Sequence, residues 1–319
     1  YLGDLAIDGN TISDIGEIKN VEARITIEAQ GRIVAPGFID MHSHSDALFA
    51  NGSTILHKLY QGVTTELVGQ DGFSMTPVVD GSKEHLTEFL DPVAGKITGG
   101  LKPWDTDDFF KSVTRQKAQL NMATLIGNAN LRLAVIGHKN SVASKNDLHK
   151  MCNLLDESLD QGAAGLSLGL IYPPSGYSNT EELVALGRVI QKHDGILVAH
   201  IRNEQAHIIE ALEEMIEIGK KSGCRIHISH LKCLGKNSWG KMPQILELID
   251  KASAQGIGMS FDQYPYDASN TSLSLLLPSW AMEGGYQGFK QFLKDSEKQH
   301  KMLICIKDAI EARGGSHSI

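Results

Sequence analysis

The stretch GRIVAPGFIDMHSHSD, residues 31–46, ends an apolar run with two histidines, His42 and His44, that are separated by one serine. If this run is a β-strand, the two side chains point to the same face and lie about 7 Å apart along it. Two neutral imidazoles that converge on one point have the geometry of metal ligands. The chain has 13 histidines, so such a pair also arises by chance in a surface loop. The pair by itself therefore leaves both interpretations open.

Short apolar runs recur along the chain, and the segments between them carry helical spacing. Strands that alternate with helices predict a parallel sheet. Seven such repeats favour a closed, TIM-like (β/α)8 barrel over an open sheet, since that barrel needs about 250 residues. We expect strands one to seven here and the eighth beyond Ile319. The predicted strands are FIDMHSH (38–44), VTTELVG (63–69), MATLIG (122–127), AGLSLGL (164–170), ILVAHI (196–201), IHISH (226–230) and GMSFDQYPY (258–266).

The chain divides into three predicted parts. Residues 1–35 form part of a small β-sandwich-like subdomain, because DLAIDGNTISDIGEI alternates apolar residues around a turn at Gly9. Residues 36–272 form the partial barrel. Residues 273–319 break the alternation and are predicted to be an insertion or lid before the eighth strand. Within them MLICIK fits either a strand or a helix.

Three more polar side chains stand where a predicted strand meets its following loop. Asp71 follows strand two, His200 ends strand five, and His230 ends strand six. Each has a simpler explanation alone, since Asp71 can cap a turn and either histidine can be a hydrogen-bonded core residue. The carboxyl ends of barrel strands meet at one rim, where barrel enzymes hold their sites. Four strand ends that carry ligand-type side chains therefore favour a metal centre made by His42, His44, Asp71, His200 and His230.

The other histidines receive no site role. His207 is expected on a helix surface, and His227 is expected to lie against helices, because its facing alternates with that of His230. The remaining seven are assigned to solvent: His57, His85, His138, His149, His193, His300 and His317.

Charge and composition narrow the possible partners. The formal net charge is −8, which argues against nucleic acid or an anionic membrane as partner. No apolar run reaches the roughly 18 residues that a membrane helix needs. The four cysteines show no CxxC spacing, so we expect a reducing cytoplasm and no disulfide framework. A small-molecule substrate is the expected partner, and the sequence carries no signal of oligomeric state.

Several motifs together resemble one known family. PGFIDMHSHSD is similar to the opening motif of the amidohydrolase superfamily. GVTTELVGQDGFS, AAGLSLGLIYPPSGYSNTEELVAL, GILVAHIRNE, IHISHLK and FDQYPYDASNTSL resemble N-acyl-D-amino-acid deacylases, the D-aminoacylase branch, from about residue 30 to 285. The resemblance implies a metal-dependent barrel that hydrolyses the amide bond of an N-acyl-D-amino acid. It also implies one or two Zn²⁺ ions, with His42 and His44 on one ion and His200 and His230 on a more tightly held one.

The chain departs from the family pattern at two positions, and the family's catalytic aspartate has no counterpart among residues 1–319. Asp71 takes the place of a family cysteine, and a carboxylate is a harder ligand than a thiolate. Asn128 follows Gly127 where the family tends to have histidine. The family's catalytic aspartate follows strand eight, so a general base is expected only beyond Ile319.

The resemblance also suggests groups that hold the substrate. Related deacylases bind the α-carboxylate with cationic and phenolic groups, which points to Lys232, Tyr264 and Tyr266. Lys232 is otherwise a solvated loop lysine, and the tyrosines are otherwise core residues with a satisfied hydroxyl. Arg202 either contacts substrate or pairs with a carboxylate such as Glu204.

Two rival functions are considered. A cyclic-amide hydrolase, such as a hydantoinase or dihydroorotase, usually bridges two metals with a carbamylated lysine after strand four, and AAGLSLGLIYPP has no lysine. A non-catalytic amidohydrolase-fold binding protein has no reason to retain His42, His44, His200 and His230.

Overall fold

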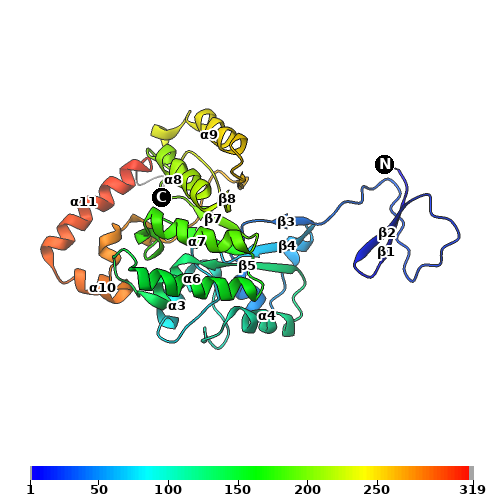
Figure 1. Ribbon diagram of the computed structural model, residues 1–319, viewed down its shortest axis with the longest axis horizontal. Coiled ribbons are helices and arrows are strands. Elements are labelled where there is room, and N and C mark those ends of the chain that lie inside the picture. Colours follow the sequence, from blue (N-terminus) through cyan, green and yellow to red (C-terminus); the bar gives the residue numbers. More distant parts are fainter. Residues whose placement is uncertain (1, 316–319) are drawn as a thin grey trace. The chain divides into compact units, whose positions relative to one another are not determined.

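The computed structural model describes residues 2–315, and the chain divides into two units after Pro36 (Figure 1). The first unit contains a hairpin. Strands β1 (Asp4–Asp8) and β2 (Thr11–Gly16) pair antiparallel. Gly9 has a φ of +61°, as the tight turn between the strands requires. The predicted hairpin is therefore confirmed.

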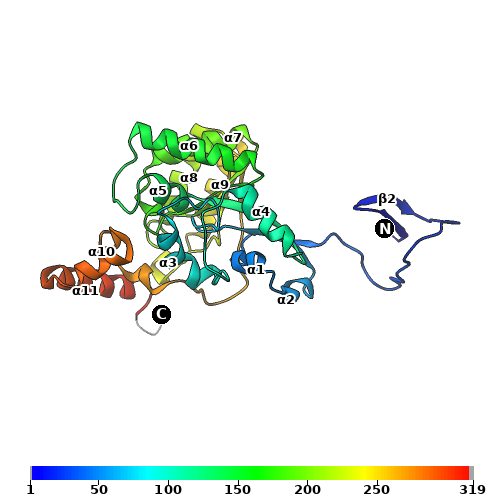
Figure 2. The same cartoon turned by 90° about the horizontal axis from the view of Figure 1, so that it is seen from below.

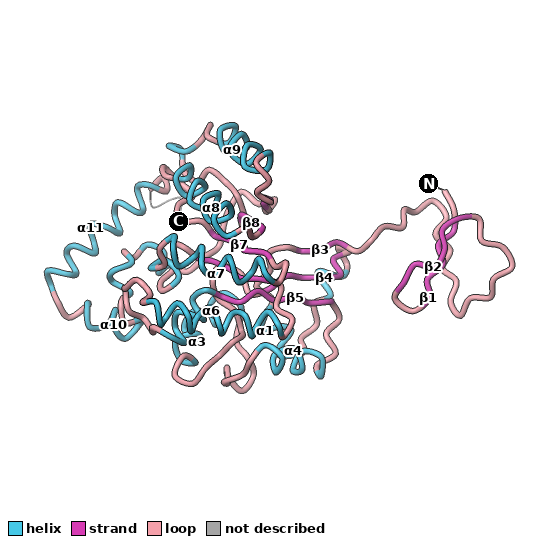
Figure 3. The backbone as a smooth tube through the Cα atoms, in the orientation of Figure 1, coloured by secondary structure: helices cyan, strands magenta, loops and turns pink. Residues whose placement is uncertain are grey.

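Seven strands of the second unit form one sheet. They pair in the order in which they occur, every neighbouring pair is parallel, and Figure 3 shows β3, β4 and β5 side by side. This order confirms the predicted barrel topology, with the seven strands forming a curled half-barrel. The strands are β3 (Phe38–Asp40), β4 (Val63–Val68), β5 (Asn121–Gly127), β6 (Gly165–Gly169), β7 (Ile196–His200), β8 (Arg225–Ile228) and β9 (Met259–Phe261).

The edge strands are shorter than predicted. The first predicted strand ran to His44, but β3 ends at Asp40, and the last ran to Tyr266, but β9 ends at Phe261. The remaining residues of both runs are loops. His42, His44 and Tyr264 are therefore held by loops, whereas His200 lies in a strand.

A layer of helices covers one face of the sheet. Helix α6 packs against α7, α7 against α8, and α8 against α9 (Figure 2). Helix α8 turns an apolar stripe toward the core, where Ile208, Leu212 and Met215 are buried. The helices and the 3-10 turns beside them are α5 (Asn128–Val135), α6 (Lys145–Asp160), η1 (Ser175–Tyr177), α7 (Thr180–Lys192), α8 (Ile208–Ser222), η2 (Lys236–Ser238) and α9 (Met242–Ala254).

Side-chain alternation along β7 decides which residues face the helices. Leu197 and Ala199 belong to the large apolar core shared with the helices. Val198 instead packs with Leu67 and Leu125 on the opposite face. Because residues two apart share a face, His200 points to the side of Val198, away from the helices.

A second apolar core lies under the helices around β4. Its members include Phe49, Leu86 and Phe109, all fully buried. They come from three of the four helices in this region, which are α1 (Asp46–Asn51), α2 (Leu56–Leu59), α3 (Lys83–Ala94) and α4 (Thr106–Arg115).

The segment after residue 272 is helical as far as it is described. MLICIK lies inside α11, so the helical alternative for it is the correct one. The segment touches the barrel through Ser279, whose carbonyl oxygen accepts a 2.8 Å hydrogen bond from the Tyr177 hydroxyl. Its elements are η3 (Leu273–Leu276), η4 (Ser279–Met282), α10 (Gly285–Phe292) and α11 (Ser296–Ala312).

Three of the histidines that were predicted to be exposed to solvent are half-buried and contact other side chains. The rings of His85 and His138 meet edge to face, 3.9 Å apart, because α3 and the turn after α5 come together. His193 is half-buried and its Nε2 lies 2.8 Å from an Asp156 oxygen. His317 lies outside the described residues. The exposed positions of His57, His149, His207 and His300 are confirmed.

Among residues 2–315, none of the helices combines the length and the apolar character needed to span a membrane.

The half-buried His138 gives the fold a pH dependence. Burial, and then the neighbouring His85, lowers the pKa of His138 from 6.5 to about 4. The unfolded chain therefore binds more protons between these values, so His138 contributes stability that is complete above pH 6.5 and is lost as the pH falls toward 4. We expect His138→Gln to flatten this part of the pH profile of the unfolding free energy, measured by urea denaturation. The exposed His149→Gln should keep the wild-type slope, and an unchanged slope in His138→Gln would contradict the assignment.

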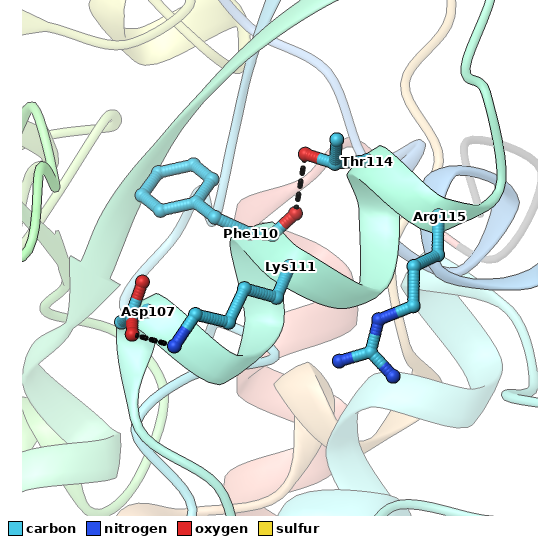
Figure 4. Close-up of a pocket in the computed structure, with 5 residues that line it drawn as sticks. All are labelled: Asp107, Phe110, Lys111, Thr114 and Arg115. Carbon is cyan, nitrogen blue, oxygen red and sulfur yellow. Dashed lines mark hydrogen bonds and ion pairs between the residues drawn. The ribbon is translucent and has the colours of Figure 1, made fainter.

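A fully buried ion pair joins α5 to α7. An Arg132 Nη1 lies 2.5 Å from a Glu182 oxygen, and both side chains are at most 1% exposed. Removing the carboxylate leaves a buried guanidinium without its counter-charge, so Glu182→Gln should lower the unfolding free energy by about 3–5 kcal/mol. The control is Asp107→Asn, which breaks the exposed pair with Lys111 (Figure 4) and should cost about 0.5 kcal/mol or less. Equal effects of the two substitutions in urea denaturation would refute this ranking.

Candidate metal centre

Five side chains predicted from strand ends come together at the carboxyl edge of the sheet, around Asp71. Its Oδ2 lies 3.6 Å from His42 Nε2 and 3.4 Å from His44 Nε2. Its Oδ1 lies 3.5 Å from His230 Nε2 and 3.8 Å from His200 Nδ1. Each oxygen of one carboxylate therefore faces a different pair of imidazoles.

These spacings suit a divalent cation. Ligand atoms about 2.0–2.2 Å from a tetrahedral ion lie about 3.3–3.6 Å from one another, which is close to the distances around Asp71. His42, Asp71 and His230 each offer an atom within 4.8 Å of the others. Asp71 Oδ1 is buried and has no hydrogen-bond partner among the described residues. A buried acceptor without a donor is a polar group that a cation would satisfy. The residues therefore fit a metal ion.

The loop after β4 aims Asp71 at the histidines. Asp71 has a φ of +55° and Gly72 a φ of +82°, so the chain turns sharply at this point. A Cβ at residue 72 would lie 2.6 Å from the backbone nitrogen of Gly169, so only glycine allows this close approach. The buried Asp46 also fixes the loop, because its Oδ1 accepts a 2.9 Å hydrogen bond from Gly69. Burial raises the pKa of Asp46 to about 6.

The pKa values of the clustered side chains are shifted by burial and by their neighbours. Burial opposes ionisation of Asp71, but contacts with three of the histidines outweigh it and hold the pKa of its carboxyl well below the usual range. Burial lowers the pKa of His200 to about 4, so this ring is neutral at pH 7. Burial also acts to lower the pKa of His230, yet Asp71 and Glu204 together raise it to about 9. A proton on His230 thus balances the two carboxylates, in a place where a cation would balance them as well.

Two carboxylates that the sequence analysis did not place in the site, Glu204 and Asp262, lie beside the cluster. Glu204 Oε1 lies 2.9 Å from His230 Nδ1 and accepts a 2.6 Å hydrogen bond from Lys232. Asp262 accepts a 2.5 Å hydrogen bond from the His230 backbone nitrogen. Asp262 follows β9 directly, so the strand-end rule that found Asp71 could also have found it. Glu204 lies four residues past His200 in a loop, and no periodic pattern marks it.

The expectation for His227 was wrong. Its neighbours Ile226 and Ile228 pack into the core shared with the helices, so His227 points to the opposite face. There its Nδ1 lies 2.8 Å from Ser260 Oγ and its Nε2 lies 2.9 Å from Asp262 Oδ2. His227 therefore holds the carboxylate that supports His230.

The four predicted substrate contacts differ in their surroundings. The Lys232 ammonium lies beside Glu204 and 5.5 Å from the centre of the Tyr264 ring. Tyr266 stacks on Tyr264 with ring centres 6.4 Å apart and is 73% exposed. Arg202 forms an ion pair with Glu214, and its guanidinium also donates to the carbonyl oxygens of Gly176 and Ser178.

Asn128, the second departure from the family pattern, lies outside the cluster. It is fully buried at the start of α5, and its Oδ1 accepts a 3.2 Å hydrogen bond from Ser178. The same hydroxyl lies closer to Glu182, 2.7 Å from its Oε1, and its single hydrogen can serve only one of the two oxygens at a time. Asn128 therefore borders the Arg132–Glu182 network.

A surface depression on α4 is unrelated to the cluster. Its lining shares no residue with the five side chains around Asp71, and Lys111 and Asp107 pair across it (Figure 4). Its lining residues are Asp107, Phe110, Lys111, Thr114 and Arg115.

Comparisons with known proteins agree with this geometry. A family model described as the amidohydrolase family matches residues 26–264. N-acyl-D-glutamate deacylase of Alcaligenes xylosoxydans xylosoxydans is 35% identical over 277 residues, which are 85% of this chain and 54% of the relative. D-aminoacylase of the same organism is 33% identical over 271 residues, with the same coverage of 85% and 54%. The chain spans about half the length of the curated relatives it matches.

A solved structure shares the fold. It is N-acyl-D-glutamate deacylase from Bordetella bronchiseptica, complexed with zinc and a phosphonate inhibitor that mimics the tetrahedral intermediate. The TM-score is 0.72 at 34% sequence identity, covering 83% of this chain and 54% of the other. This likeness supports the barrel topology read from the sheet.

The cluster predicts binding of a divalent cation. We expect the purified full chain to take up Zn²⁺, measured by titration calorimetry and by metal analysis after dialysis. His230→Ala should weaken binding by more than the roughly 10–100-fold that a change outside the ligand shell causes. The exposed His207→Ala serves as control and should bind as wild type does. Unchanged zinc content in His230→Ala would show that the centre lies elsewhere.

Proposed function

Because this chain belongs to the amidohydrolase family, we propose that the protein is a zinc-dependent hydrolase that releases a D-amino acid from an N-acyl-D-amino acid. The relatives described above support the substrate class, since they are named as deacylases of N-acyl-D-amino acids. The observation that carries the proposal is the Asp71 carboxylate, whose two oxygens face two pairs of histidines.

The proposed ligands are His42, His44, Asp71, His200 and His230, and they hold one or two ions. A bound zinc ion would supply Lewis-acid chemistry, polarising the amide carbonyl and acidifying a water molecule. The protein's own part is to keep these side chains in place and to bind the substrate. Asp71 replaces a thiolate with a harder oxygen ligand, so ions that prefer oxygen should compete better here than at a thiolate.

Lys232 is the group that we assign to the substrate α-carboxylate. Its ammonium donates to Glu204 and, at 3.0 Å, to the carbonyl oxygen of His230. An ammonium has three N–H donors, so one is left for an anion as long as His230 Nδ1, 3.2 Å away, itself carries a proton. The centre of the Tyr264 ring lies 5.5 Å from this ammonium, and Tyr264 and Tyr266 offer phenolic donors from the same loop. Arg202 is not assigned to substrate, because four of its five N–H donors already bind protein oxygens.

The general base is proposed to be an aspartate beyond Ile319. Two carboxylates near the cluster have other partners. Asp71 faces four imidazole nitrogens, and Asp262 holds both His227 and the backbone of His230. Neither is free to carry a proton between water and a leaving amine.

We also propose a reducing compartment, the cytoplasm, as the place of action. All four cysteines, at positions 152, 224, 233 and 305, are free thiols. Free thiols persist where the cell keeps them reduced.

Substrate panels test the proposed reaction. The full protein loaded with Zn²⁺ should release free amino acid from N-acetyl-D-amino acids, measured with a ninhydrin-type amine assay. The matched N-acetyl-L series and the cyclic amides hydantoin and dihydroorotate are the controls and should react far more slowly. Hydrolysis of only the L series or only the cyclic amides would contradict the proposed activity and identify a different one. Zinc binding without turnover of any panel member would favour a non-catalytic binding protein.

A further inference from the structure

We propose that Glu204 is a positioning residue, which fixes the ring nitrogens that His200 and His230 present to the metal. The inference rests on the proposed role of these histidines as ligands. It goes further because it assigns the choice of the metal-facing nitrogen in both rings to one carboxylate that is not itself a proposed ligand.

Glu204 lies on the far side of both rings from Asp71. His230 turns its Nδ1 to Glu204 at 2.9 Å and its Nε2 to Asp71 at 3.5 Å. His200 turns its Nε2 toward Glu204 Oε2 at 4.0 Å and its Nδ1 to Asp71 at 3.8 Å. The two histidines thus use opposite nitrogens on the metal side, and the same carboxylate stands behind both.

A carboxylate chooses the tautomer of a neutral imidazole. An ionised carboxylate only accepts hydrogen bonds, so the His230 nitrogen that faces Glu204 must carry the proton. The other nitrogen then keeps its lone pair for a cation. A carboxylate behind a metal-bound histidine also makes the ring a stronger ligand. His200 is too far for a hydrogen bond, but the negative charge favours the N–H form at its Nε2.

Lys232 competes for the His230 nitrogen that faces Glu204. Its ammonium lies 3.2 Å from His230 Nδ1 and can only donate. Without Glu204, Lys232 would donate to Nδ1 and move the ring proton to Nε2, which faces Asp71. Glu204 prevents this by accepting from both groups, from Lys232 at 2.6 Å and from His230 at 2.9 Å. One carboxylate therefore sets the tautomer and holds the competing ammonium.

Glu204 is itself held in place. It is only 8% exposed, and its backbone oxygen accepts a 2.8 Å hydrogen bond from Leu234 in the loop after β8. A role as a direct ligand is less consistent with these contacts, although His200, Glu204 and His230 offer atoms within 4.8 Å of one another. The ammonium and the imidazole N–H already occupy Oε1, and a positive ammonium beside it repels a cation.

Three variants of the full chain test the assignment by zinc affinity, measured by competition with a chromophoric chelator. Glu204→Met keeps the volume and removes the acceptor, so affinity should fall by about 10–100-fold. Glu204→Gln keeps a neutral acceptor and should recover part of the loss; it also serves if Glu204→Met does not fold. The double variant Glu204→Met with Lys232→Met removes the competing donor and should bind zinc more tightly than Glu204→Met alone. Glu214→Met is the control, since it removes a carboxylate paired with Arg202, and it should bind within about twofold of wild type.

Imidazole ¹⁵N spectra of the zinc-loaded wild type give an independent readout. His230 should show a protonated Nδ1 and a coordinated Nε2, and a coordinated Nδ1 would overturn the proposal. Zinc affinity in Glu204→Met and Glu204→Gln equal to that of the Glu214→Met control would also overturn it, and would leave Glu204 a structural ion-pair partner. Absence of zinc binding by the wild type would instead remove the proposed metal centre on which the inference rests.

Discussion

The site depends on a mostly buried carboxylate that four imidazoles surround. The Asp71 side chain is only 15% exposed, and a charge shielded from water is costly unless opposite charge or donors compensate it. The histidines supply that compensation from two sides, one pair for each oxygen. Such an arrangement requires the left-handed backbone at Asp71 and the close approach of Gly72 to Gly169. Local strain, burial and charge are therefore concentrated at the same few residues, as expected at a functional site.

The parallel sheet is what makes this meeting possible. Its strands pair in chain order, so the loops after β3, β4 and β8 and the end of β7 open at the same edge. Helices cover the other face and bury the outward residues of each strand, which leaves the remaining face for Val198 and His200. Apolar packing sets the positions of the strands, and the polar cluster uses the edge that packing leaves available.

A second group of polar residues surrounds the candidate metal ligands and is connected by hydrogen bonds. Glu204 links Lys232 to His230, and Asp262 links His227 to the backbone of His230. Both carboxylates contact His230, and both make further hydrogen bonds of their own. The proposed metal ligands need such support, because a ligand atom that shifts by a few tenths of an ångström binds its ion more weakly.

The sequence by itself determined the parallel strand–helix order, the N-terminal hairpin and the places, at or just after the ends of strands, where His42, His44, Asp71, His200 and His230 lie. Periodicity and strand-end position are local signals, so they can be read without coordinates. Only the tertiary structure decided that His227 faces Asp262, that His85 meets His138, that Arg202 pairs with Glu214 and that Glu204 stands behind His230. These contacts join segments whose separation in the chain carries no periodic signal. Their geometry is set by how helices and loops pack, and no single stretch of residues encodes that packing.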